Sequence, residues 1–416
     1  MDEKNYVRSL AEKVHEISLS DEMNRRRDLW RRHNSLEKTE PPIFVRAYAA
    51  AEVPQLVDLA CADETLRQME RHFKSLLYKF SLGDDCVIEP WYAVRAVFIY
   101  PEGGGHWGFP FTVTHPKDAA KRGAFIFNPH ITEESDIKKI AKPVHAVDEQ
   151  KTSEAYERIS ELLYGAMPVV TDRAPLYTGF AGDISTDLAY MRGIEGMMWD
   201  MADRPEWLHK VTSFMGAGIL NAQSFAEEAG DFNLFAQENQ AVSYAKELPA
   251  PRAGGVSAKR SEIWSFGASQ ETAAVSPSMW EEFIFRYQKP VLEKYGLTSY
   301  GCCEDMTRKI PILKSGLKNL RRVAVTPWAD ARGCAQQLGS EYVYSWRPSP
   351  TDTVACGFDE ERVKKMTRSI FNLAREHKNH IDITLKDVET VSDKPESVIN
   401  FVRAVREVIS EGGWQW

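Results

Sequence analysis

The last third of the chain alternates between short apolar runs and amphipathic stretches, and this alternation restricts the folds open to it. Apolar runs occupy 322–326, 342–345 and 381–385, and a fourth ends near Tyr300. Each run is followed by polar residues and then by a stretch with apolar side chains at helical spacing. Strands that alternate with helices in this way pair in parallel, because the helix returns the chain to the same end of the sheet.

The rest of the chain supplies enough further strands for a barrel. Upstream candidates bring the total to about eight, and they lie at 43–45, 86–91, 167–171, 232–235 and 262–271. The length of 416 residues and the hydrophobic content of 43% suit one large core. We therefore predict an α/β fold, a (β/α)8 TIM-like barrel over residues 41–416. A helical lead-in at 1–40 and a Gly- and Pro-rich excursion around 100–150 would be additions to it, and a doubly wound open sheet is the alternative.

Charge and hydropathy exclude several classes of partner. The net charge is −8 and the isoelectric point is near 5.8, so no basic surface is available to neutralise nucleic-acid phosphates. No apolar run approaches the 18 or so residues that a membrane span needs. The polar start of the chain lacks a signal peptide, and the six Cys match no disulfide framework. We expect a cytoplasmic protein with reduced thiols.

The stretch Tyr300-Gly301-Cys302-Cys303-Glu304-Asp305 is where we expect the chemistry. Thiols and acids at the end of a strand are unusual, because the tail of a buried parallel strand is normally Val, Ile or Leu. Junctions between strands and helices are where parallel α/β folds place their active sites. Adjacent residues on extended backbone point to opposite faces, so only one of the two thiols should face a cavity. The plainer alternative is that both Cys are buried apolar residues.

Polar side chains also follow the other predicted strands. If the strands form a barrel, their carboxyl ends share one face, and one cavity would be surrounded by Glu89, Glu271, Cys303, Glu304, Asp330, Arg347, Lys386, Asp387 and Glu389. Thiolate and carboxylate groups are ligands that catalytic zinc uses, with three protein ligands and one open position. Cys303 is the strongest ligand candidate, followed by Glu304 and Glu271.

The order of these strand ends resembles the uroporphyrinogen decarboxylase superfamily over roughly residues 41–409. Ser276-Pro277 followed by Trp280-Glu281-Glu282-Phe283, and a helix with Tyr287 and Pro290 that leads to the cluster at 300–304, support the resemblance. So do the strand exits Pro327-Trp328-Ala329-Asp330 and Leu385-Lys386-Asp387-Val388-Glu389. The superfamily implies a (β/α)8 barrel and two branches of activity. One branch decarboxylates a tetrapyrrole without a cofactor, and the other transfers methyl groups to corrinoids with the help of zinc.

Comparison of motifs favours the methyltransferase branch. The decarboxylases carry an R-Q-A-G-R motif after the first strand, where this chain keeps only Arg46 in Val45-Arg46-Ala47. The methyltransferases carry H-x-C, which matches Gly301-Cys302-Cys303, so that the Cys carries over to Cys303 and the His does not. Further ligands would then come from Asp387, Glu389, Glu271 or Glu304. No D-x-H-x-x-G corrinoid motif occurs, so the corrinoid (cobalamin) would arrive on a partner protein.

The resemblance thus implies a zinc-dependent enzyme that moves a methyl group from a small methylated substrate to a corrinoid protein. The sequence leaves the oligomeric state open, a homodimer included. We assign the residues by role. The metal ligands are Cys303, Glu271 and Asp387; the catalytic residues are Glu304, Asp330 and Lys386; the substrate contacts are Arg46, Glu89, Trp91, Tyr300, Trp328 and Arg347.

Two other functions stay open. The first is a cofactor-independent decarboxylase or lyase, in which Arg46, Arg95 or Arg347 holds a carboxylate and Asp330 protonates the product. The second is a barrel that binds a small ligand without catalysis.

Overall fold

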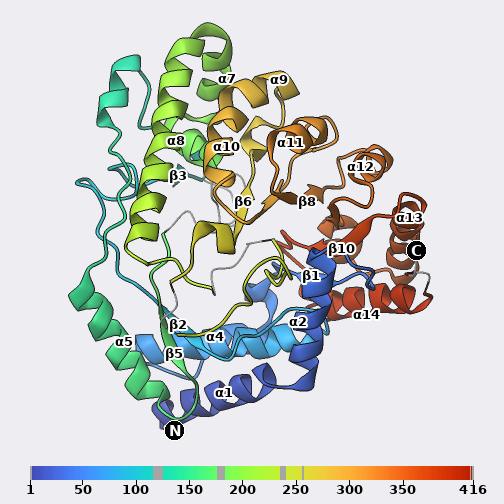
Figure 1. Cartoon of the computed structure of the whole chain (residues 1–416). Coiled ribbons are helices and arrows are strands. Elements are labelled where there is room, and N and C mark those ends of the chain that lie inside the picture. Colours follow the sequence, from blue (N-terminus) through green and yellow to red (C-terminus); the bar gives the residue numbers. More distant parts are fainter. Residues whose placement is uncertain are drawn as a thin grey trace.

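The computed structural model describes residues 2–115, 125–175, 183–234, 240–254, 257–412 and 414 (Figure 1). Its helices, in chain order, are α1 (Glu3–Ser18), α2 (Asp21–Asn34), α3 (Pro54–Val57), α4 (Glu64–Ser81), α5 (Glu149–Leu163), α6 (Ile184–Arg192), α7 (Ile194–Asp203), α8 (Pro205–Glu228), α9 (Pro277–Trp280), α10 (Arg286–Leu292), α11 (Ile310–Gly316), α12 (Ala331–Leu338), α13 (Glu360–Glu376) and α14 (Glu396–Ser410). π-Helical turns occur at Glu281–Phe285 and Thr351–Ala355. Within the described residues, no helix combines the length and the hydropathy needed to cross a membrane.

Six parallel strands form the central sheet, in the order β1-β10-β9-β8-β7-β6. The sheet curls into a half-barrel, with helices α11 to α14 outside it (Figure 1). Consecutive strands from β6 to β10 are neighbours, so the predicted parallel βα units of the last third of the chain are confirmed. The strand bounds are β1 (Ile43–Val45), β6 (Trp264–Gly267), β7 (Leu297–Tyr300), β8 (Leu320–Val325), β9 (Val343–Trp346) and β10 (His380–Leu385).

Two further parallel strands, β2 (Tyr92–Arg95) and β5 (Val169–Asp172), pair with each other in a separate sheet. A short antiparallel pair, β3 (Val113–Thr114) with β4 (Ile126–Phe127), lies in the predicted excursion. Among the described residues, hydrogen bonds therefore do not join the eight parallel strands into one ring. The α/β class with parallel strands is confirmed, while closure of the barrel stays a prediction.

The central ladder ends at β1 for a local reason. The amides of Ile43 and Val45, which a neighbouring strand would use, donate instead to the carboxylates of Asp85 and Asp84, each at 2.8 Å. Lys79 forms an ion pair of 2.6 Å with Asp84 and so compensates the buried charge. Two aspartates therefore occupy the outer edge of β1 where a second strand would have to pair.

The predicted strand at 86–91 is wrong. Its carbonyls at Cys86 and Ile88 accept hydrogen bonds from Arg26 and Arg27 on α2, each at 2.9 Å, and Pro90 has no amide to donate. The strand begins only at Tyr92.

The predicted strand at 232–235 is also wrong over its described part. Asn233 forms an isolated bridge with Ser257 rather than a ladder, and position 235 lies outside the described residues.

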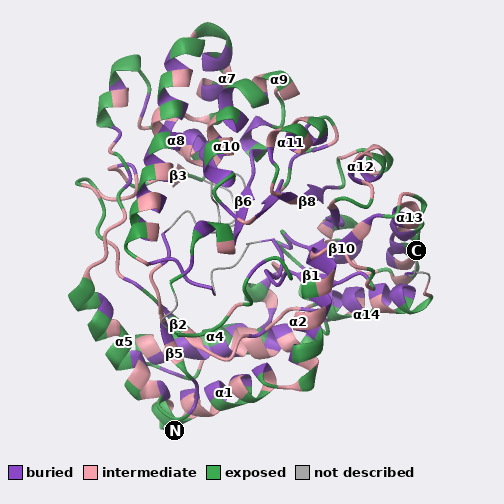
Figure 2. Ribbon diagram, viewed as in Figure 1, coloured by how far each residue is buried: buried purple, intermediate pink, exposed green. Residues whose placement is uncertain are grey.

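The predicted helical lead-in is confirmed as α1 and α2, although its standing as a separate domain stays a prediction. Apolar side chains of α1, such as Val7 and Val14, share a core with Phe73 of α4 and Leu163 of α5. Burial follows the expected pattern. The strands β6, β7 and β9 are buried throughout, and helices such as α13 and α14 alternate between buried and exposed faces (Figure 2).

Candidate active site

A cavity of about 410 Å³ opens at the carboxyl ends of β7, β8, β9 and β10. Each strand contributes the residues that directly follow it, as the shared direction of parallel strands requires. The π-helical turn Thr351–Ala355 closes one side, and such turns are frequent at functional sites. The lining residues are Cys302, Cys303, Thr326, Pro327, Trp328, Arg347, Pro348, Ser349, Pro350, Thr351, Ala355, Lys386, Asp387, Glu389 and Thr390.

The chain turns sharply after β7 because of Gly301. Its φ of +100° is in the region that favours glycine, and a Cβ there would lie 3.1 Å from Cγ of Met306 and 3.2 Å from Cβ of Ala324. A histidine at this position would be both strained and crowded.

Glu304 holds this turn in place. Its carboxylate accepts the amide of Ser269, after β6, and the amide of Cys302, each at 2.9 Å. The side chain is 1% exposed and is not part of the cavity lining. Glu304 thus bonds to the backbone at Cys302 and lies outside the cavity lining, and its catalytic role stays a prediction.

Lys386 lies at the centre of the polar groups in the cavity. Its ammonium nitrogen Nζ is 2.9 Å from Sγ of Cys302, 3.2 Å from Sγ of Cys303 and 3.0 Å from Oδ2 of Asp387. The two sulfur atoms are 3.6 Å apart and share a hydrogen bond, and Sγ of Cys303 lies 3.3 Å from Oδ2 of Asp387. Asp387 adopts a φ of +58°, an uncommon conformation for a residue with a side chain and one that recurs at functional sites.

The electrostatics favour ionisation of Cys302 over Cys303. A hydrogen bond from Cys303 and the charge of Lys386 outweigh burial and lower the pKa of Cys302 from its ordinary 9.0 to about 7. The same hydrogen bond, together with burial, raises the pKa of Cys303. Burial alone would lower the pKa of Lys386, but the two thiols and Asp387 raise it. These shifts favour a Cys302 thiolate beside a protonated Cys303 and a charged Lys386.

The predicted zinc ligands are brought together only in part. Cys303 and Asp387 meet, but the carboxylate of Glu271 accepts the hydroxyls of Ser185 and Thr186, at 2.7 and 2.8 Å, outside the cavity lining. Across the described parts of the chain, no three His, Cys, Asp or Glu side chains are grouped so as to hold a metal ion. The ammonium of Lys386 occupies the space between the sulfur and carboxylate groups. These residues do not fit a zinc ion.

Trp328 and Arg347, two of the predicted substrate contacts, line the cavity. Trp328 is 75% exposed at its edge, whereas Arg347 is 2% exposed.

Four other residues that the sequence proposed for the site or for a carboxylate contact lie outside the cavity lining. Asp330 caps α12 by accepting the amide of Gly333 at 3.0 Å. Tyr300 is fully buried, and its hydroxyl donates to Gln288 at 2.5 Å. Arg46, whose amide continues the ladder to Leu385, is not part of the cavity lining, and Arg95 forms an ion pair of 2.7 Å with Asp172.

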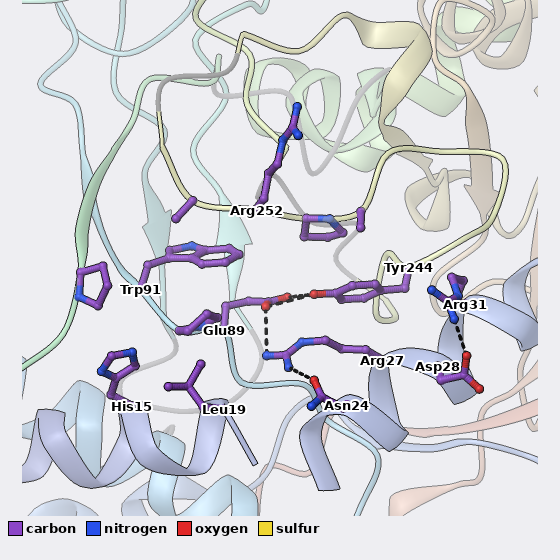
Figure 3. A pocket seen from close by; sticks show the side chains of 15 residues that line it. His15, Leu19, Asn24, Arg27, Asp28, Arg31, Glu89, Trp91, Tyr244 and Arg252 are labelled. Carbon is purple, nitrogen blue, oxygen red and sulfur yellow. Dashed lines mark hydrogen bonds and ion pairs between the residues drawn. The ribbon is translucent and has the colours of Figure 1, made fainter. Parts of the chain in front are cut away.

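Glu89 and Trp91 line a different cavity, of about 770 Å³ (Figure 3). They precede β2 rather than follow a strand, so they lie at the amino end of β2 and not at the carboxyl ends of β7 to β10. The carboxylate of Glu89 accepts the hydroxyl of Tyr244 at 2.8 Å and forms a longer contact of 3.5 Å with Arg27 of α2. Figure 3 shows Glu89 joined by dashed lines to Tyr244 and Arg27, with Trp91 next to Glu89.

No protein-family model matches this sequence, and no curated protein matches it. Among solved structures, the chain is similar to a methyltransferase from Methanosarcina mazei, with a TM-score of 0.48 and 13% sequence identity. The similarity spans 93% of this chain and 98% of the other. At this level, the similarity assigns no function to the chain.

Cys302 lines the cavity, although the sequence assigned it no role. Alternation along an extended strand predicts that only one of the two thiols faces the cavity, yet both line it. The extended conformation ends at Gly301, so alternation does not apply to the two residues that follow. The Gly before the Cys pair was the signal in the sequence.

Proposed function

We propose that the chain is an enzyme that transfers a methyl group from a small methylated substrate, with the Cys302 thiolate as its nucleophile. The observation that carries the proposal is the contact of 2.9 Å between Lys386 and Cys302 inside the cavity. A thiolate stabilised by an ammonium group is a strong nucleophile near neutral pH. The reaction class comes from the resemblance to the corrinoid-linked methyltransferases, and the closed eight-stranded barrel is part of the same proposal.

In the proposed step, the sulfur of Cys302 attacks the methyl carbon of the substrate. A carbon–sulfur bond forms while the bond from the methyl carbon to its heteroatom breaks, and the electron pair goes to the heteroatom. The ammonium of Lys386, which already touches the sulfur, gives its proton to the departing heteroatom. Arg347 and Trp328, which line the same cavity, orient the rest of the substrate.

Onward transfer restores the Cys302 thiolate. Its lowered pKa, about 7, makes this thiolate a better leaving group than an ordinary one. The acceptor implied by the resemblance is a corrinoid protein, because reduced cobalt is a strong nucleophile toward methyl carbon. Zinc, also implied by the resemblance, takes no part in these steps.

A decarboxylase acting on a carboxylated substrate is the second candidate. The specific observation in its favour is that Arg347 and Lys386 place two cations in one cavity. Asp330, which caps α12, would not be its proton donor, and Arg46 and Arg95 would not bind its substrate in this cavity. Release of carbon dioxide by a variant that lacks Cys302 would favour this second function.

The test is peptide mass spectrometry after incubation of the reduced protein with methylated amines, thiols and methoxyaromatics. The proposal predicts a mass increase of one methyl group on Cys302 and its loss when cob(I)alamin is added. Transfer that needs stoichiometric zinc, is abolished by chelators and leaves Cys302 unmodified would overturn the proposal and restore the zinc-dependent mechanism.

A further inference from the structure

Adjacent thiols that share a cavity make a chelating unit, and the cavity at the ends of β7 to β10 contains one. The sulfur atoms of Cys302 and Cys303 are 3.6 Å apart, and both line the cavity. In the described parts of the chain, the remaining cysteines are single. Cys61 and Cys334 are buried, Cys86 is half-buried and Cys356 is exposed.

We propose that Cys302 and Cys303 together bind a thiophilic metalloid compound, a trivalent arsenical that carries one organic substituent. Thiolates are soft ligands that prefer soft centres. Zinc needs at least three protein ligands, which this site does not bring together. A trivalent arsenic atom with one carbon substituent has two positions left, and two thiols fill them.

The reaction is a ligand exchange with no change in oxidation state. Two arsenic–sulfur bonds form, one to Cys302 and one to Cys303, and two arsenic–hydroxyl bonds break. The thiol proton of Cys303, together with the proton of Cys302 or one from solvent where Cys302 is already ionised, leaves with the two hydroxyl groups as two molecules of water. Lys386 can move off the sulfur atoms without losing its counter-ion, because Asp387 lies 3.0 Å from its nitrogen.

The cavity also accommodates the organic substituent. Its volume of about 410 Å³ extends from the sulfur atoms to the rings of Trp328, Pro348 and Pro350. This wall gives an apolar substituent a surface that inorganic arsenite, with a third hydroxyl, cannot use. The site should therefore prefer monosubstituted arsenicals to arsenite.

This binding goes beyond the proposed methyl transfer and needs a residue that the transfer does not. Methyl transfer uses Cys302 with Lys386, whereas chelation uses both thiols. The variant Cys303→Ser separates the two, since it should lose chelation and keep a Cys302 that can be alkylated. Failure of one proposal therefore leaves the other testable.

The experiment titrates the reduced full-length protein with phenylarsine oxide and with arsenite, and follows intact mass and thiol count. We expect one arsenical per chain with loss of two titratable thiols. Each of Cys302→Ser and Cys303→Ser should weaken binding by about 10²-fold or more, because the second bond is intramolecular. Cys356→Ser, which removes a single exposed thiol, is the matched control and should bind like the unaltered chain.

A cooperative urea unfolding transition with a midpoint near that of the unaltered chain shows that the Cys303→Ser variant is folded. The proposal is overturned if this variant binds phenylarsine oxide as tightly as the unaltered chain. It is equally overturned if binding consumes one thiol only, or if arsenite binds as tightly as phenylarsine oxide.

Discussion

Strand β10 contributes to two charged clusters, one inside the sheet and one at the strand ends. Inside, Arg322 of β8 and Asp382 of β10 form a fully buried ion pair of 2.9 Å, joined by His33 of α2 at 3.3 Å. At the ends, Lys386 lies four residues beyond Asp382 and faces the thiols across a cavity. The first cluster is enclosed by protein, whereas the second is open to a substrate.

The difference shows what a buried charge does when its partners are all internal. Burial would raise the pKa of Asp382, but Arg322 and His33 lower it to about 2. Burial lowers the pKa of His33, so Arg322 carries the compensating charge. The inner cluster also fastens α2 to the sheet, since Asn34 bonds to Arg322 and to the carbonyl of Val242. It stabilises the fold, while the outer cluster activates a thiol.

The largest expected effect is on activity, from Cys302→Ser. Loss of the nucleophile should lower methyl transfer by about 10³-fold or more, because serine is not ionised by Lys386. Stability should change little, since the side chain borders a cavity. Methyl-transfer kinetics and urea unfolding of this variant, with Cys356→Ser as control, measure the effects on activity and on stability. Full activity in Cys302→Ser would assign the chemistry to another group.

The converse change is Asp382→Asn in the inner cluster. It leaves the buried Arg322 without its counter-ion and should cost about 3–5 kcal/mol of unfolding free energy. Urea unfolding measures this cost. Asp387→Asn, at a half-exposed carboxylate of the outer cluster, is the control and should cost about 0.5 kcal/mol or less. Equal costs for the two variants would remove the distinction between the clusters.

The contribution of Asp382 to stability should depend on pH. The pKa of Asp382 in the folded chain, about 2, lies below its ordinary 3.8. The stabilisation is therefore complete above pH 4 and is lost as the pH falls toward 2. Unfolding free energies measured between pH 5 and pH 2 should fall less steeply in Asp382→Asn than in the unaltered chain. Parallel curves would show that Asp382 is not linked to folding.

A smaller effect is expected from Glu304→Gln. Its amide can accept only one of the two amides that the carboxylate accepts, so the variant should lose about 1–3 kcal/mol of stability. Glu304 also raises the pKa of Cys302 by its charge. The pH midpoint of Cys302 alkylation should therefore move down in this variant, a readout that a purely structural role would not change. An unchanged midpoint would mean that Glu304 holds the turn and does not affect the pKa of Cys302.

The sequence predicted the elements well where a single physical rule decides them. Alternation of strands and helices fixed the parallel sheet, and the shared direction of its strands placed Cys303, Arg347, Lys386 and Asp387 at one cavity. Ser276 and Pro277 opened α9 as helix-start preferences predict.

The misplaced residues depend on contacts that the pattern does not contain. Glu271 turns toward Ser185 and Thr186, which are more than 80 residues away in the chain. Glu89 was placed at a strand end because the apolar run before it resembles a strand. The carbonyls of that run instead accept hydrogen bonds from arginines of α2. The contact of Lys386 with Cys302 spans 84 positions, so it could be found only in three dimensions.

The most direct test of the account is the pH dependence of Cys302 alkylation by iodoacetamide, followed by peptide mass spectrometry. The thiolate fraction, and with it the rate, should rise through a midpoint near pH 7. In Lys386→Met the midpoint should move toward 9 and the rate at pH 7 should fall about 10-fold or more, while Lys386→Arg keeps most of the effect. A midpoint near 9 in the unaltered chain, or one that Lys386→Met leaves in place, would contradict the claim that Lys386 activates Cys302.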